Sequence, residues 1–99
     1  MHHYNFKISG ITFDTWFKPS EEMAGNIGLA NFNAQTISIN NDQSPQTKRI
    51  AAWHEIIHIM DSIYGLGLSE EQVIRQAHAM VGFFEDNQHL VDDKGLWHE

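Results

Sequence analysis

The segment His54-Glu55-Ile56-Ile57-His58 combines two residue types that bind and use divalent metals. On an α-helix the two histidines, four residues apart, project from one face about one turn apart. Two imidazoles in this arrangement can bind a single zinc ion without distorting the backbone. Glu55 flanks that face, where its carboxylate is offset from the metal ligands but can reach a water molecule activated by the metal. The segment therefore predicts a zinc site with Glu55 as the general base of a hydrolytic reaction.

A catalytic zinc ion needs a third protein ligand and one open coordination position. Two acidic residues, Glu70 and Glu71, begin a second helical pattern after the short turn that follows the histidines. Glu70 falls within the inward-facing arc of this helix, where a buried carboxylate needs a positive partner. We therefore expect Glu70 rather than Glu71 to be the third ligand. Both could instead be acidic residues that stabilise the N-terminus of a helix.

Asp61 and His78 are weaker candidates on the same two helices. Asp61 shares the histidine face, but it lies about 10.5 Å along the axis from His54, too far for a short side chain to bind the same ion. We expect Asp61 to orient one of the imidazoles, or else to be a solvated or helix-capping carboxylate. His78 lies off the apolar stripe of the second helix and is expected on the surface.

The sequence pattern also predicts the elements that hold these residues in place. Residues 1–42 are mainly β-structure, in which residues 27–33 and residues 36–40 form an antiparallel hairpin. The motif helix is expected over residues 44–64, because Ser44 followed by Pro45 is typical of a helix N-terminus.

The glutamate helix is expected over residues 69–87, since Ser69 and Gln72 can form a capping box. Residues 88–99 form a polar C-terminal tail. The length of 99 residues suits one domain over residues 1–99. The prediction is an α+β domain with a short antiparallel sheet followed by two helices.

The composition limits the site and its partners. The chain has no cysteine, which excludes thiolate ligands and disulfide bonds and is compatible with a reducing cytoplasm. Its net charge of −7 argues against direct binding to nucleic acid, which depends on phosphate contacts. No apolar run approaches the roughly 20 residues of a membrane span, and the N-terminus lacks the apolar region of a signal peptide. We expect a cytoplasmic protein without membrane or nucleic-acid partners.

The "HEIIH" segment, followed after eleven residues by a glutamate, resembles the gluzincin class of zinc peptidases. The order of sheet, strand "TISIN", motif helix, turn and glutamate helix is similar to the minigluzincins and to the peptidase domain of ImmA/IrrE-type proteins. This resemblance covers residues 36–84 and implies a zincin-like fold. It also implies one Zn²⁺ per chain, bound by His54, His58 and Glu70, with Glu55 as the catalytic residue and a peptide or protein as the substrate.

In such enzymes the strand before the motif helix borders the cleft and can pair with an extended substrate. The resemblance therefore implies that Ile37, Ser38 and Ile39 bind substrate, although "TISIN" could simply be a strand of the sheet. Two functions of other classes are also open. The chain could be a catalytically idle zinc-binding module, or a regulatory interaction protein of a phage or mobile element.

Overall fold

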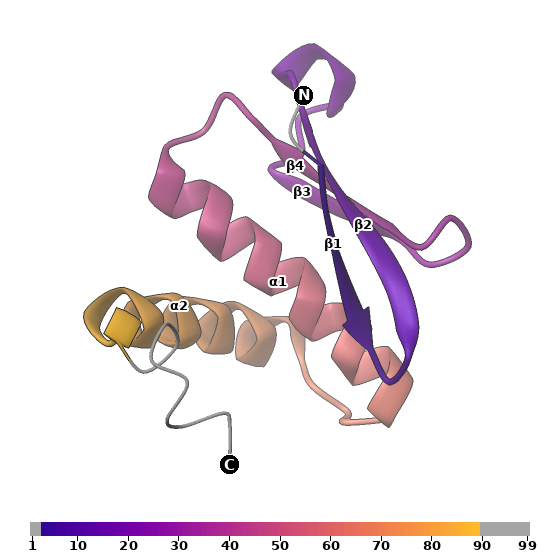
Figure 1. Ribbon diagram of the computed structural model, residues 1–99, viewed down its shortest axis with the longest axis vertical. Coiled ribbons are helices and arrows are strands. Elements are labelled where there is room, and N and C mark those ends of the chain that lie inside the picture. Colours follow the sequence, from indigo (N-terminus) through magenta and orange to yellow (C-terminus); the bar gives the residue numbers. More distant parts are fainter. Residues whose placement is uncertain (1–2, 90–99) are drawn as a thin grey trace.

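The computed structural model describes residues 3–89, and it contains a four-stranded sheet followed by two helices (Figure 1). The strands are β1 (His3–Ile8), β2 (Ile11–Lys18), β3 (Gly28–Asn31) and β4 (Thr36–Asn40), with the short 3-10 helix η1 (Ser20–Glu22) between β2 and β3. The helices are α1 (Pro45–Tyr64) and α2 (Glu70–Asp86). The fold is therefore α+β, as the sequence predicts. Most of the tail expected over residues 88–99 lies outside the described residues.

The sheet has the strand order β1-β2-β4-β3 and is mixed rather than purely antiparallel. A two-residue turn joins β1 to β2, and its residues Ser9 and Gly10 both have positive φ, as a type I′ hairpin requires. The hairpin of β3 and β4 is also antiparallel, as expected. The segment between β2 and β4 reverses direction at η1 and again after β3. As a result β4 enters the sheet parallel to β2.

The strand β4 lies in the interior of the sheet and is paired on both sides. The expectation that Ile37, Ser38 and Ile39 pair with a substrate is therefore wrong, because the backbone of this strand is already occupied by β2 and β3. The side chains of Ile37 and Ile39 are also completely buried. Within the described residues, β3 is the edge strand on this side of the sheet.

Both helices begin and end close to the predicted residues. The hydroxyl of Ser44 accepts a hydrogen bond from the Thr47 N–H at the start of α1, and Gly65 ends this helix in the left-handed conformation. Both halves of the capping box between Ser69 and Gln72 are present at the start of α2. These caps fix the length of the turn that separates the histidines from Glu70.

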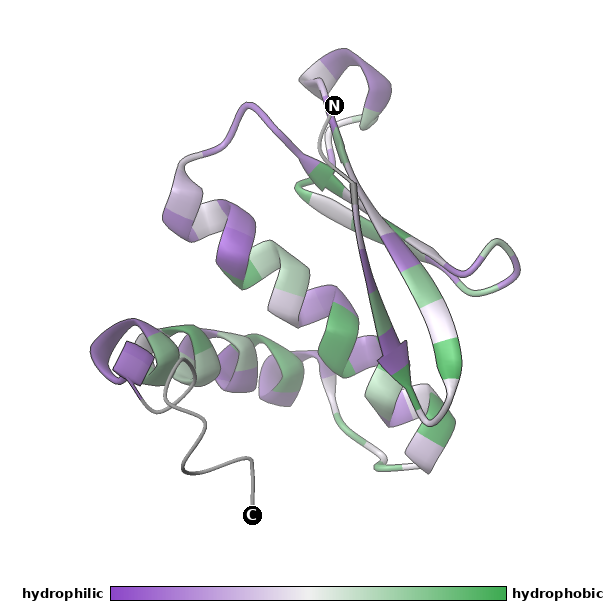
Figure 2. Cartoon of the chain, viewed as in Figure 1, coloured by the Kyte–Doolittle hydropathy of each residue, from purple (hydrophilic) through white to green (hydrophobic). Residues whose placement is uncertain are grey.

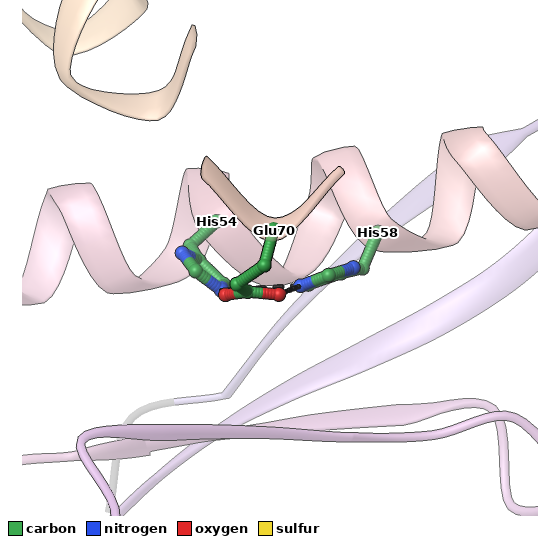
Figure 3. Close-up of side chains that lie close together, drawn as sticks. All are labelled: His54, His58 and Glu70. Carbon is green, nitrogen blue, oxygen red and sulfur yellow. Dashed lines mark hydrogen bonds and ion pairs between the residues drawn. The ribbon is translucent and has the colours of Figure 1, made fainter. Parts of the chain in front are cut away.

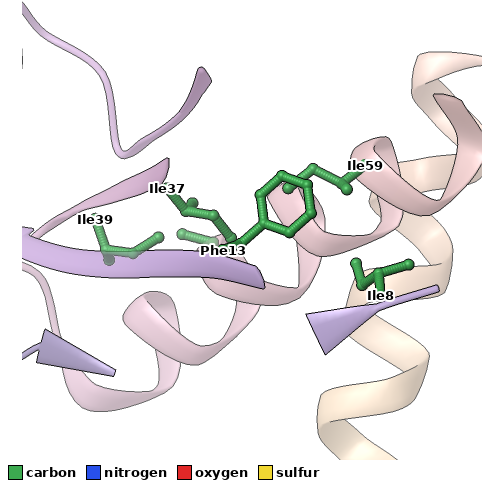
Figure 4. Packing of buried hydrophobic residues seen from close by; sticks show 6 residues of the cluster. Ile8, Phe13, Ile37, Ile39 and Ile59 are labelled. Carbon is green, nitrogen blue, oxygen red and sulfur yellow. The ribbon is translucent and has the colours of Figure 1, made fainter. Parts of the chain in front are cut away.

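Helix α1 lies between the sheet and α2 (Figure 1). On the sheet side, the core contains Ile59 of α1 together with buried residues of three strands; this cluster comprises Ile8, Phe13, Ile37, Ile39, Ala51 and Ile59 (Figure 4). On the other side, Ile57 packs against Val73 and Ala77 of α2. Hydrophobic and hydrophilic residues alternate along α2, as expected for a helix with one buried side (Figure 2). Burial on two sides fixes the rotation of α1 about its axis.

Candidate metal centre

His54 and His58 project from the same side of α1, and their Nε2 atoms are 3.2 Å apart (Figure 3). The ring centroids are separated by 4.8 Å. Both side chains are partly exposed, so the pair is open to an ion from solvent. Ile57 and Ile59 are buried on opposite sides of α1, which fixes the rotation of this helix about its axis. The direction in which both histidines project is therefore fixed as well.

Glu70, the first residue of α2, places its carboxylate between the two imidazoles (Figure 3). Its Oε1 atom lies 2.8 Å from Nε2 of His54, and its Oε2 atom lies 2.9 Å from Nε2 of His58. One ligand atom from each of the three residues lies within 4.8 Å of the others. A tetrahedral zinc ion with bonds of about 2.0–2.1 Å would space its ligand atoms about 3.3 Å apart. The three side chains could therefore hold one metal ion after small adjustments.

The two glutamates at the start of α2 point in different directions. Glu71 forms an ion pair with Arg75, one turn further along the exposed side of the helix. Glu70 is the one that reaches the histidines, as expected, but the expected reason is wrong. Its side chain is 60% exposed rather than buried. It reaches the imidazoles because the turn over residues 65–69 brings the N-terminus of α2 beside the middle of α1.

Asp61 does not orient an imidazole through a hydrogen bond, and that expectation is corrected by the structure. Its carboxylate Oδ1 accepts a hydrogen bond from the backbone N–H of Leu68, at 3.1 Å. The backbone carbonyl of Asp61 accepts further bonds from Gly65 and Leu66. Asp61 therefore stabilises the turn that precedes Glu70, which lies two residues after Leu68. Its effect on the cluster is exerted through the backbone of this turn.

Glu55 is half-buried between α1 and the first residue of β3. A Cβ atom added at Gly28 would lie 3.2 Å from Oε2 of Glu55, so the strand backbone and the carboxylate are in close approach. Burial raises the pKa of the Glu55 carboxyl above its ordinary value. The charges of His54 and His58 oppose this shift, and the charge of Glu70 reinforces it. A carboxylate of raised basicity beside a group of candidate metal ligands is suited to accept a proton.

A hollow of about 510 Å³ opens beside His54 and Glu55. Its lining comes from residues 25–28, from the first half of α1 and from His78 of α2. His78 is exposed, as the sequence predicts, and its Nδ1 lies 2.9 Å from the carbonyl oxygen of Ile74. Its place in this hollow is not evident from the sequence. Helical register alone puts His78 about 80° from Glu70 around the axis of α2, and it gives no information about β3.

Comparison of the chain with protein-family models, with curated proteins and with solved structures found no match. Over residues 3–89, neither helix combines the length and the apolar character needed to cross a bilayer.

Proposed function

We propose that this protein is a zinc-dependent metallopeptidase of the gluzincin type that hydrolyses peptide bonds in peptide or protein substrates. The observation that carries the proposal is the convergence of three ligand atoms from two helices, with the Glu55 carboxylate next to them. Two histidines and one glutamate are a donor set found in catalytic zinc sites, where a fourth position stays open. A purely structural zinc site would instead be expected to have four protein ligands.

The proposed chemistry divides among the four side chains. Zinc at this position would supply Lewis-acid activation of a water molecule and of the substrate carbonyl. His54, His58 and Glu70 hold the metal, which requires that each imidazole carries its proton on Nδ1 and leaves Nε2 free. Glu55 accepts the proton of the attacking water on its carboxylate and then donates it to the leaving amine.

The edge strand β3 is the element best placed to bind the substrate backbone. Gly28, its first residue, lies against the side chain of Glu55, so the edge of this strand that is unpaired within residues 3–89 begins at the proposed general base. An extended peptide can add to such an edge through backbone hydrogen bonds. This assignment replaces the interior strand β4, whose backbone groups are already paired.

The proposal is tested with zinc-loaded protein and a set of fluorogenic peptides. Wild-type protein is expected to bind one zinc ion per chain and to cleave peptide bonds. Glu55→Gln should keep the zinc and lose about 10²–10⁴-fold in kcat, since this is the contribution of general acid–base catalysis. Glu71→Gln is the matched control, because Glu71 pairs with Arg75 away from the cluster. Unchanged kcat in Glu55→Gln, or the absence of stoichiometric zinc, would contradict the proposal.

A zinc-binding module without catalysis is the second candidate, and one observation favours it. The ligands come from both α1 and α2, so a bound ion would clamp the two helices of a small domain together. This function predicts that chelation lowers the melting temperature while no peptide of the set is cleaved.

A regulatory interaction protein would instead form a complex that Glu55→Gln leaves intact. The absence of cysteine is compatible with action in the cytoplasm.

A further inference from the structure

We infer that a second hollow, on the side of α1 that faces β1 and β2, binds the anion of a small apolar carboxylic acid. The hollow has a volume of about 260 Å³ and lies between Tyr4 of β1, Phe17 of β2 and the first half of α1. The residues that α1 contributes to its lining are Pro45, Lys48, Arg49 and Ala52. It shares no lining residue with the hollow beside Glu55, so this inference does not depend on the peptidase function.

Lys48 provides the positive charge that this hollow offers to an anion. Its ammonium group lies 5.9 Å from the centroid of the Phe17 ring and donates a hydrogen bond of 3.2 Å to Oδ1 of Asn41. Both partners are uncharged, and within residues 3–89 Lys48 forms no ion pair. Because an ammonium group has three donor hydrogens, an anion can bind it without displacing Asn41.

Arg49 is the other basic residue of the lining, but its charge is already balanced. Its Nε atom donates a hydrogen bond of 3.0 Å to Oε2 of Glu85, with which the guanidinium group also forms an ion pair. Within residues 3–89, no acidic residue belongs to the lining. The hollow therefore has one positive charge without a counter-ion. One such charge suits a monoanion, whereas a phosphate dianion would keep part of its charge uncompensated.

The remaining walls favour an apolar group attached to the carboxylate. The rings of Tyr4 and Phe17 are in edge contact, with centroids 5.9 Å apart, and Pro45 and Ala52 add aliphatic surface from α1. The volume of about 260 Å³ lies just below the roughly 300–1,000 Å³ that is usual for ligand pockets. The occupant is therefore a small acid whose apolar group has the size of a side chain, such as a phenyl ring or a branched alkyl group.

The test follows the backbone amide NMR shifts of the full-length chain during titration with 3-phenylpropionate. Shifts are expected at Asn41, Lys48 and Ala52 and not at His54 or His58, which separates this site from the candidate metal centre. The neutral 3-phenylpropanamide should bind about tenfold more weakly or worse, because it cannot form a charge-assisted hydrogen bond with Lys48. Acetate should be weaker by a similar factor, because it lacks the apolar group.

Substitution of Lys48 tests the charge directly. Lys48→Gln should weaken binding of 3-phenylpropionate by about tenfold or more, whereas Lys48→Arg should keep most of the affinity. Lys7→Gln is the matched control, since Lys7 is exposed on β1 and lies outside the lining. The ligand series uses the unsubstituted chain, so it decides the question even if a variant unfolds.

Several results would overturn the site: equal affinity for the acid and the amide, equal or tighter binding of inorganic phosphate, shifts confined to other residues, or unchanged affinity in Lys48→Gln. The peptide Gly-Gly-Phe distinguishes a free acid from the end of a chain. If this peptide bound about tenfold more tightly than 3-phenylpropionate, the inference of a free acid would be wrong. None of these measurements involves zinc or peptide cleavage, so their failure would leave the peptidase proposal untouched.

Discussion

At the scale of single residues, the candidate metal site depends on which atoms of the three side chains converge, and not only on which residues lie nearby. His54 and His58 both present Nε2, and each of these atoms lies within 3 Å of a Glu70 oxygen. The four-residue spacing predicts that the imidazoles share a face, because that follows from helical geometry alone. The carboxylate comes from another helix, so its arrival at both rings depends on how the helices pack.

Removal of either histidine is expected to abolish stoichiometric zinc binding. His54→Ala or His58→Ala should weaken the affinity more than 100-fold, because loss of a mere supporting partner of a ligand already lowers it by about 10–100-fold. His78→Ala is the control, since His78 is exposed and does not belong to the three-residue cluster. The loss of zinc affinity is measured by competition with a chromophoric chelator. Equal affinity in His54→Ala and wild type would exclude the cluster as the zinc site.

The raised pKa of Glu55 predicts how pH affects the stability of the metal-free protein. Burial makes ionisation of Glu55 unfavourable in the folded state, so its pKa there exceeds the unfolded value of about 4.3. The penalty is fully present above the folded-state pKa and disappears as pH falls below the unfolded value. Glu55→Gln should therefore be more stable than wild type at neutral pH, and the difference should shrink toward pH 4.

Thermal melts in the presence of a chelator, recorded from pH 4 to pH 7.5, measure this difference. Glu71→Gln is the control because this exposed side chain pairs with Arg75 instead of packing against β3. A stability difference for Glu55→Gln that grows as the pH falls would have the wrong sign and would refute the effect of burial.

At the scale of elements, the caps could be predicted from the sequence and the sheet order could not. Ser44 with Pro45, and Ser69 with Gln72, act on residues within one turn of themselves, so a local pattern is enough to place the helix ends. The position of β4 between β2 and β3 depends on pairing between distant segments. Alternating hydrophobicity indicates a strand, but it does not identify the strand's neighbours. For this reason the sequence pattern predicts an open edge at β4, which the structure places inside the sheet.

The turn between the helices gives a prediction at this scale. Asp61→Ala removes the acceptor of the Leu68 N–H, and it should lower the free energy of unfolding by about 1 kcal/mol. It should also weaken zinc binding, because Glu70 follows this turn. Asp61→Asn keeps an oxygen acceptor and should restore most of both properties. Urea denaturation and zinc titration measure them, and unchanged zinc affinity in Asp61→Ala would show that the turn does not position Glu70.

The contact between β3 and α1 gives another prediction at the scale of elements. Gly28→Ala should lower kcat while zinc content stays at one ion per chain, because the new Cβ displaces the Glu55 carboxylate and not the metal ligands. Gly82→Ala in α2 is the matched control, as a Cβ there meets no atom within 4 Å. That change should stabilise the helix by about 0.5–1 kcal/mol and leave kcat unaltered. Steady-state kinetics of both variants decide whether close approach at Gly28 matters, and equal kcat in wild type and Gly28→Ala would reject it.

At the scale of the whole molecule, three layers stack in the order sheet, α1, α2 (Figure 1). A domain of 99 residues buries a limited core, so its stability is small and sensitive to any ligand that binds only the folded state. The cluster joins the two helices, since α1 carries His54 and His58 and α2 carries Glu70. Fold class and helix positions follow from the sequence pattern. The contact of Glu70 with the two histidines depends on how the helices pack.

Zinc is therefore expected to stabilise the whole domain. At a free concentration 100-fold above Kd, an ion that binds only the folded state adds about 2.7 kcal/mol. For a domain of this size, each kcal/mol raises Tm by about 4–8 °C. Scanning fluorimetry with zinc and then with excess chelator should show this rise and its reversal. His58→Ala should show neither, and a similar rise in that variant would indicate binding elsewhere.

Within residues 3–89 the outer edge of β3 is unpaired, and this affects how copies of the chain meet one another. Many proteins protect such an edge with charged residues or proline, but β3 has the sequence Gly-Leu-Ala-Asn, and Leu29 and the following Phe32 are exposed. An edge that is open to a peptide is equally open to the same strand of another copy. The repulsion between chains of net charge −7 opposes that pairing, so mild acid, which neutralises this charge, should promote strand-to-strand association.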